Sequence, residues 1–338
     1  MMLASIWFVL VMVLLIGYAV LDGFDLGVGI LHLFARNNEE RRAGMLAIGP
    51  VWDGNEVWLI AGGGALFAAF PAVYATAFEG FYLALVLVLL ALVARAVSLE
   101  FRGKVASTVW RRAWDWAFGF GSLLVALLLG VALGNILRGL PIDADGAFTG
   151  TFLGLLHPYA LAWGLLSVAA CTMHGAAYLV LKADGALQVR MKRWVNGAWV
   201  VFVCLLCVVG VSSAFASPFL LAGLAGKPLS CILMLLFFAG LVSTSVTTKM
   251  GSHLVAFVSS ALTIASVIGV LAVGLYPRLI PSSIDLSYSL TVDNASSSYL
   301  TLRAMLIIAL IGVPIVIGYT AFVYSVFKGK VDPSDTAY

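Results

Sequence analysis

The sequence predicts an all-α polytopic membrane protein, and composition and hydropathy pattern are the two observations that support this fold class. Hydrophobic residues make up 62% of the 338 positions, charged residues only 10%, and the mean hydropathy is +1.08. A soluble domain of this length could not solvate such a surface. The hydrophobic residues also form runs long enough for helices that cross the hydrocarbon, which takes about 20 residues.

About nine such runs are candidate transmembrane helices, with approximate ends. They cover Leu3–Phe34, Met45–Phe70, Ala77–Leu99, Trp114–Leu137, Phe152–Leu181, Val195–Leu220, Leu229–Thr247, Leu254–Tyr276 and Leu300–Phe327. The second run is the weakest, because its uninterrupted apolar part, Val57–Phe70, is too short alone. It spans the membrane only if the acidic turn with Asp53 and Glu56 is also inside. With no linker, repeat or soluble segment, residues 1–338 are expected to form a single membrane domain.

The basic residues predict the orientation. Most of the 19 Lys and Arg residues fall in alternate loops or the C-terminal tail: Arg36, Arg41, Arg42, Arg102, Lys104, Arg111, Arg112, Lys182, Arg190, Lys192, Arg193, Lys249, Lys328 and Lys330. The opposite loops hold Arg138, Lys227 and Arg278, with Arg303 just inside the last run. Since cytoplasmic loops carry the excess of basic residues, the N-terminus is expected outside and the C-terminus in the cytoplasm.

Four acidic residues lie inside the first two runs, where charge is costly and usually functional. Asp22 and Asp25 are three apart and share a helix face, and Asp53 and Glu56 repeat that spacing. Each pair would lie about 16 Å from the first cytoplasmic loop if the runs are helical. Arg95 is in the cytoplasmic half of the third run. Three adjacent helices are therefore expected to bring four acids and one base towards one level.

One base cannot neutralise four acids. Arg95 is expected to pair with one carboxylate, most simply Asp53 or Asp25, while the others are protonated, hydrated or paired with a partner subunit. Burial favours the neutral acid and a guanidinium favours the carboxylate, so such a cluster can pass protons between neighbours. The alternative is that the acids bond to the backbone and lock helices together. That alternative has more weight for Asp22, towards the end of its run, than for Asp53.

The four histidines predict neither a metal site nor a haem-ligand set. His157 and His174 share one run but lie about 25 Å apart if helical, too far to share a ligand. His32 and His253 are near loop ends. Each is expected to be a hydrogen-bonded packing residue, although His174, deep in an apolar run, is the one that a ligand role would suit best.

Two motifs resemble subunit II of the cytochrome bd-type quinol oxidases: Asp22–Gly29, which reads DGFDLGVG, and Gly49–Trp58, which reads GPVWDGNEVW. Further agreement comes from Ala65–Pro71, Arg95, Trp114–Trp116 and Pro281–Ser283, so the resemblance covers essentially the whole chain. This chain is shorter than some members, chiefly around Pro218–Pro228.

The resemblance implies nine transmembrane helices as two four-helix bundles plus a peripheral helix, paired with a subunit I that holds the haems b and d. It implies a complex in the bacterial or archaeal plasma (inner) membrane that oxidises quinol and reduces O2 to water. The position matching Asp53 is associated with a hydrophilic route for cytoplasmic protons, and Asp25 and Arg95 match other polar positions. Some members hold a quinone in this subunit, which no residue here places, and the complex has room for a small single-helix accessory subunit.

We therefore predict a proton path of Asp53, Glu56, Asp25 and Asp22, with Arg95 as the charge partner, serving chemistry in another subunit. One alternative is a proton-coupled secondary transporter, which glycine-interrupted helices with intramembrane acids would suit, but no inverted repeat is visible. The other is a purely structural scaffold for subunit I. The net charge of +3 gives no sign of nucleic-acid binding. Besides subunit I, membrane lipid is the partner that the apolar runs lead us to expect.

Overall fold

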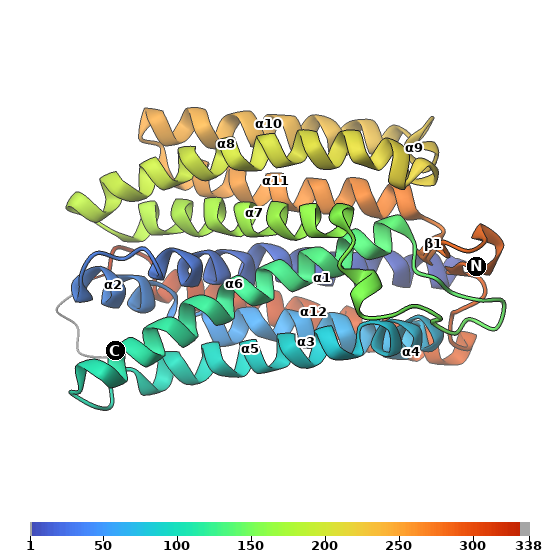
Figure 1. Cartoon of the computed structure of the whole chain (residues 1–338), viewed down its shortest axis with the longest axis horizontal. Helices are drawn as coiled ribbons and strands as arrows, with labels where there is room; N and C mark the ends of the chain where they lie inside the picture. Colours follow the sequence, from blue (N-terminus) through green and yellow to red (C-terminus); the bar gives the residue numbers. More distant parts are fainter. Residues whose placement is uncertain (1, 332–338) are drawn as a thin grey trace.

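The protein is a bundle of twelve α-helices in a computed structural model that describes residues 2–331, and most of the helices run along its long axis (Figure 1). The first half contains α1 (Met2–His32), α2 (Asn38–Ile48), α3 (Trp52–Ala69), α4 (Pro71–Gly80), α5 (Tyr82–Phe101) and α6 (Thr108–Arg138). The second half contains α7 (Pro158–Lys182), α8 (Gly185–Ala216), α9 (Pro218–Leu224), α10 (Pro228–Met250), α11 (His253–Leu275) and α12 (Tyr299–Val326).

Eight helices in the described part of the chain are long and apolar enough to cross a membrane: α1, α5, α6, α7, α8, α10, α11 and α12. The prediction of an all-α polytopic membrane protein is therefore confirmed. Within the fold, α1 packs on α3 and α6, and α6 packs on α5. In the second half, α7 packs on α8 and α11, and α10 packs on α11 and α8. Contacts of α1 and α6 with α7 join the two groups, while α12 lies against α1 and α3 (Figure 1).

The predicted second run, Met45–Phe70, is wrong as one helix. It is divided into the end of α2, which stops at Ile48, and α3, which starts at Trp52. Pro50 lies in the turn between them, and a proline inside a helix removes a backbone hydrogen bond and clashes with the preceding turn. Because of this break, α3 begins as a separate helix beside α1. The position at which α3 begins determines where Asp53 and Glu56 lie.

Three other predicted runs are also divided or shortened. Ala77–Leu99 contains the junction at Phe81 between α4 and α5. Val195–Leu220 ends α8 at Ala216 and continues as α9 from Pro218, and the run from Phe152 becomes a regular helix only at Pro158, after the 3-10 turn Leu153–Leu155. In α7 and α9 a proline opens the new helix, at the position where its missing N–H costs nothing.

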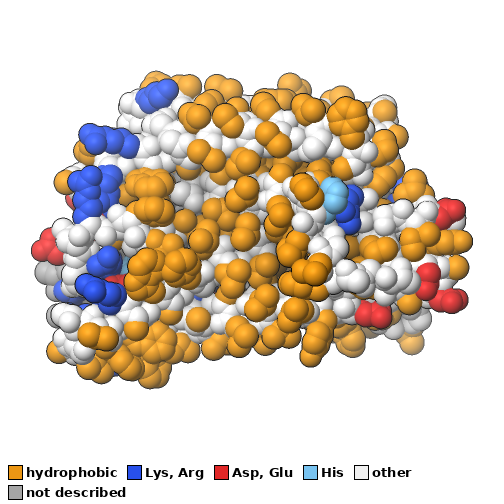
Figure 2. Space-filling view, in the orientation of Figure 1, with side chains coloured by type: hydrophobic (Ala, Val, Ile, Leu, Met, Phe, Trp, Pro, Cys, Tyr) orange, Lys and Arg blue, Asp and Glu red, His pale blue; other side chains and the backbone are white. Residues whose placement is uncertain are grey.

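Basic side chains are concentrated at one end of the bundle. Lys and Arg gather at the end drawn at the left in Figure 2, together with some acidic side chains, while most of the charged side chains visible at the opposite end are Asp and Glu. That opposite end carries the loop between α11 and α12. The loop forms the two-stranded sheet of β1 (Arg278–Ile280) and β2 (Leu290–Thr291), with the 3-10 turn Leu286–Tyr288 between them, and buries Ile280 and Ser282.

Glycines of α1 and α7 bring the backbones of the two halves into direct contact. A Cβ at Gly27 would lie 1.9 Å from the carbonyl oxygen of Cys171, and a Cβ at Gly175 would lie 2.5 Å from the carbonyl carbon of Gly27. These are backbone atoms, which cannot swing away. Gly27, the second glycine of the GxxxG spacing in α1, therefore lets the two backbones touch.

We predict that Gly27→Ala destabilises the protein by about 1–3 kcal/mol or more, because the methyl group forces α1 away from α7. The measurement is the apparent melting temperature of the purified complex in detergent. The matched control is Gly210→Ala in α8, where a Cβ meets nothing within 4 Å. Equal melting temperatures for the two variants would show that this helix contact is not tight.

Candidate functional site

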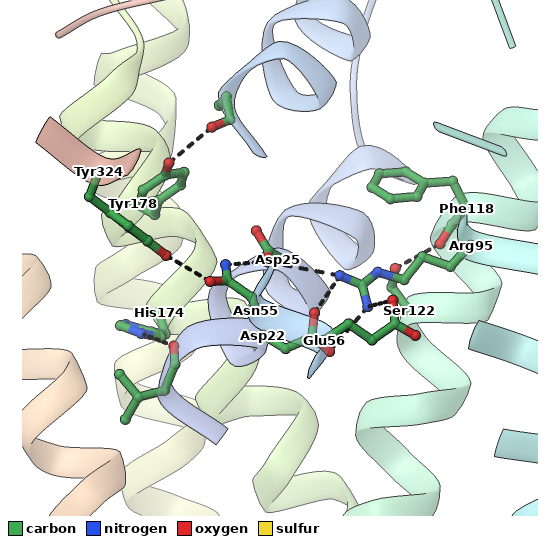
Figure 3. A network of polar contacts seen from close by, with 12 residues as sticks. Asp22, Asp25, Asn55, Glu56, Arg95, Phe118, Ser122, His174, Tyr178 and Tyr324 are labelled. Carbon is green, nitrogen blue, oxygen red and sulfur yellow. Dashed lines mark hydrogen bonds and ion pairs between the residues drawn. The ribbon is translucent and has the colours of Figure 1, made fainter. Parts of the chain in front are cut away.

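A buried ion pair joins α1 to α5 in the interior of the first-half helices (Figure 3). Both nitrogens at the end of the Arg95 guanidinium bond to the Asp22 carboxylate, and Nη1 lies 3.1 Å from Oδ2. Both side chains are 0% exposed. The backbone of α6 passes close to α5 at Gly121, where a Cβ would lie 2.8 Å from the carbonyl oxygen of Ala91, one turn before Arg95. Asp22, not Asp53 or Asp25, is therefore the main partner of Arg95, contrary to the sequence-based expectation.

Asp25 extends the pair towards α3 and α12. Its Oδ2 accepts a hydrogen bond from Asn55 Nδ2 at 2.7 Å and lies 4.0 Å from Arg95 Nη2. Tyr324 of α12 in turn donates its hydroxyl hydrogen to Asn55 Oδ1 at 3.0 Å (Figure 3). The other oxygen of Asp25, Oδ1, is buried and has no hydrogen-bond partner among the described residues. A buried carboxyl oxygen without a partner is costly, so Asp25 is the least satisfied member of the network.

The two acids of α3 differ in their relation to this network. Glu56 reaches inward, with Oε2 3.9 Å from Arg95 Nη1 and 19% of its side chain exposed. Asp53, one turn earlier, is exposed and has no ion pair with any described residue. The expectation of four acids at one level is therefore met by three, and Asp53 lies at the surface of the chain.

The start of α3 explains this division. Because α3 begins at Trp52, its first turn presents Asn55 and Glu56 to α1 while Asp53 points elsewhere. Asn55 belongs to the motif Gly49–Trp58, but nothing in the sequence distinguished it as a hydrogen-bond partner of Asp25. Tyr324 was not predicted at all, since nothing in its own run separates it from other interfacial tyrosines.

The cluster can hold and exchange protons. One guanidinium faces three carboxyl groups, so at most one of the three negative charges is balanced within the described residues. Desolvation disfavours each further carboxylate, and the Arg95 charge favours it. Several carboxyl groups that a single guanidinium cannot all balance are the kind of arrangement that a proton relay requires.

Two of the histidines are held by hydrogen bonds within the protein. His174 uses both ring nitrogens, Nδ1 with Ser260 Oγ at 2.7 Å and Nε2 with the carbonyl oxygen of Val20 at 3.0 Å, and it stacks on Phe257. His32 Nε2 lies 2.7 Å from Asp115 Oδ1. Across residues 2–331, no three His, Cys, Asp or Glu side chains are grouped to hold a metal ion.

A second charged cluster was missed at the basic end. Asp115 is buried at this end and is 8% exposed. Arg102 Nε donates to its Oδ1 at 2.5 Å, and Arg41 Nε lies 3.6 Å from its Oδ2.

The helices and their buried charges define a multi-pass membrane protein with a polar site between its helices, in which three carboxyl groups surround one guanidinium. Comparisons identify the family. The profile of the cytochrome bd terminal oxidase subunit II family matches residues 3–327. The chain is 39% identical to the cytochrome bd-I ubiquinol oxidase subunit 2 of Escherichia coli K12, covering 98% of this chain and 96% of the relative. It is also 39% identical to the cytochrome bd ubiquinol oxidase subunit 2 of Bacillus subtilis, covering 97% of each.

The fold agrees with these matches. A chain in the structure of the bd oxidase from Geobacillus thermodenitrificans superimposes with a TM-score of 0.81 at 17% identity, covering 97% of this chain and 99% of that chain. The chain belongs to the cytochrome bd terminal oxidase subunit II family, and it is thus a multi-pass subunit of an oxidoreductase complex of the bacterial inner membrane. The resemblance seen in its motifs is confirmed, and the transporter alternative is not supported.

We predict that Arg95→Gln destabilises the chain by about 3–5 kcal/mol, because it leaves the Asp22 carboxylate buried without its partner. The double variant Asp22→Asn with Arg95→Gln is expected to recover much of that loss, since both buried charges are gone. Apparent melting temperatures of the two variants, measured side by side, test this. A double variant no more stable than the single one would show that the ion pair is not the dominant interaction there.

Proposed function

We propose that the chain, paired with a haem-bearing subunit I, carries protons from the cytoplasm towards the site where that subunit reduces O2, with quinol as the electron donor. The observation that carries the proposal is the excess of three buried or partly buried carboxyl groups over one guanidinium at Arg95. Members of the family named as quinol oxidase subunits supply the reaction for which such protons are needed.

The path that we infer runs along α3 and into the first-half bundle. Asp53 is exposed and lies three residues before Glu56, so the two side chains are neighbours on the helix. Glu56 is in ion-pair range of Arg95, which links it to Asp22 and Asp25. Protons would pass between the exposed acid and the interior cluster through Glu56, the one acid that is both partly exposed and in contact with Arg95.

The open face of α3 suits contact with subunit I. Beyond Asp53 it presents exposed apolar side chains at helical spacing, with Val57 49%, Ile60 72% and Phe67 58% exposed. Gly64 on the same helix has nothing within 4 Å of a built Cβ, so another helix can approach closely. A partner on this face would enclose Asp53 and turn it from a surface acid into a buried one.

The proposed topology has nine crossings, two four-helix bundles and one peripheral helix. The ninth crossing is α3, which lies antiparallel to α1: Asn55 meets Asp25, and a Cβ at Gly62 would contact Leu15. The bundles are α1, α3, α5 and α6, and α7, α8, α10 and α11, with α12 peripheral. The gathering of Lys and Arg at one end supports a cytoplasmic C-terminus and an external N-terminus (Figure 2).

The haems b and d belong in this proposal to subunit I, because the described histidines are engaged in protein hydrogen bonds or stand alone. We assign no residue of this chain to a bound quinone or to a small single-helix accessory subunit. A scaffold role is the second candidate, since the closed Asp22–Arg95 pair would lock α1 to α5 without moving protons.

The proton role predicts that Asp53→Asn and Glu56→Gln each lower quinol oxidase turnover by about tenfold or more, because an amide cannot pass a proton on. Turnover is measured on the assembled complex and divided by its haem content, which separates loss of assembly from loss of activity. Glu79→Gln in α4 is the matched control, an exposed acid outside the cluster. Unchanged turnover at unchanged haem content in both variants would leave only the scaffold role.

The proposed orientation predicts that a fluorescent protein fused after Tyr338 is fluorescent and that alkaline phosphatase fused there is inactive, because the C-terminus is cytoplasmic. Cell fluorescence and phosphatase activity at matched expression are the measurements. An active phosphatase fusion would reverse the orientation and place the basic end outside.

A further inference from the structure

The strongest unassigned feature is a cavity of about 300 Å³ at the basic end, between α1, α2 and α6. It is lined by His32, Leu33, Arg41, Arg112, Asp115 and Trp116. Its volume is at the lower limit of small-molecule sites. None of these residues belongs to the Arg95 cluster, so the cavity is separate from the proposed proton path.

The charges around the cavity are unbalanced in favour of an anion. Among the described residues, Asp115 is the only carboxylate that lines it, and Arg102 and Arg41 both lie within ion-pair distance of that side chain. His32 also bonds to Asp115. Arg112 is exposed, lines the cavity and has no ion pair with any residue in the part of the chain that the structure describes. Three guanidinium groups thus face one carboxylate.

An aromatic surface continues from Arg112 along α6 towards the middle of the bundle. Arg112, Trp116 and Phe120 are spaced four residues apart and therefore share one helix face. Trp116 is 51% and Phe120 53% exposed, and their rings stack with centroids 4.9 Å apart. The order along the helix is a cation, then an interfacial tryptophan, then a second exposed ring, which matches the order of headgroup, interface and acyl chain in a lipid leaflet.

We propose that this cavity binds the phosphate headgroup of an anionic phospholipid of the cytoplasmic leaflet. Arg112 and Arg41 contact the phosphate, and an acyl chain lies along Trp116 and Phe120. Basic pockets between transmembrane helices on the cytoplasmic side are typical sites for such headgroups. The cationic lining selects against zwitterionic lipids, whose headgroups carry no net charge.

The test uses the complex of this chain with subunit I, freed of native lipid in detergent and titrated with phosphatidylglycerol or phosphatidylcholine. Native mass spectrometry reports the bound lipid. The wild type is expected to prefer phosphatidylglycerol, and Arg112→Gln to weaken that binding about fivefold, in line with one basic residue at a membrane surface. Arg111→Gln is the matched control: it removes the adjacent cation, which does not line the cavity, and is expected to leave the affinity unchanged.

A second variant separates a lipid from a soluble anion. Trp116→Ala is expected to weaken phosphatidylglycerol binding, whereas inorganic phosphate alone should compete poorly, because it makes no acyl contact. Equal binding of the two lipids, or equal losses in Arg112→Gln and Arg111→Gln, would overturn the proposal. So would full displacement of the lipid by inorganic phosphate at millimolar concentration, which would make the cavity a site for free anions.

Discussion

The buried ion pair between Asp22 and Arg95 is the interaction on which the arrangement of the first-half helices depends. Removing two charges from water costs several kcal/mol each, and only a close bidentate contact offsets that cost. Asp22 and Arg95 make such a contact with no solvent exposure on either side chain. It ties α1 to α5 and requires α6 to pass close by at Gly121. Once the pair is formed, any further acid nearby has no second cation to balance it among the described residues.

Because positive charge is short, the carboxyl groups of the site are incompletely paired. Asp25 keeps one buried oxygen without a partner, and Glu56 reaches Arg95 only at 3.9 Å. A fully paired network would be rigid and inert, whereas an incompletely paired one responds to protons. The hydrogen bonds from Asn55 to Asp25 and from Tyr324 to Asn55 also connect the site to α12, the most peripheral helix. Asp25 is thus linked by two hydrogen bonds to the outer edge of the subunit.

Several features could be predicted from residues alone because they follow from local rules. Long apolar runs become helices wherever the backbone must satisfy its own hydrogen bonds in lipid, and eight of the runs did so. The spacing of Asp22 and Asp25 predicted a shared helix face, and Arg95 was correctly placed beside that face. The prediction that each run forms one uninterrupted helix was wrong in several places. Pro50 divides the second run, and Phe81 and Ser217 lie at junctions between two helices in two other runs. Hydropathy measures the length of apolar sequence and does not detect such breaks.

The chain's composition and motifs therefore settle its class and family, since hydrophobicity and residue identity belong to the linear sequence. Only the tertiary structure decided which acid meets Arg95, because that choice depends on how α3 starts and turns relative to α1. A rotation of one residue about a helix axis, about 100°, exchanges an inward side chain for an outward one. Asp53 and Glu56 are three residues, and therefore only about 60°, apart around α3. No property of the sequence near them distinguishes the exposed acid from the one that reaches the guanidinium.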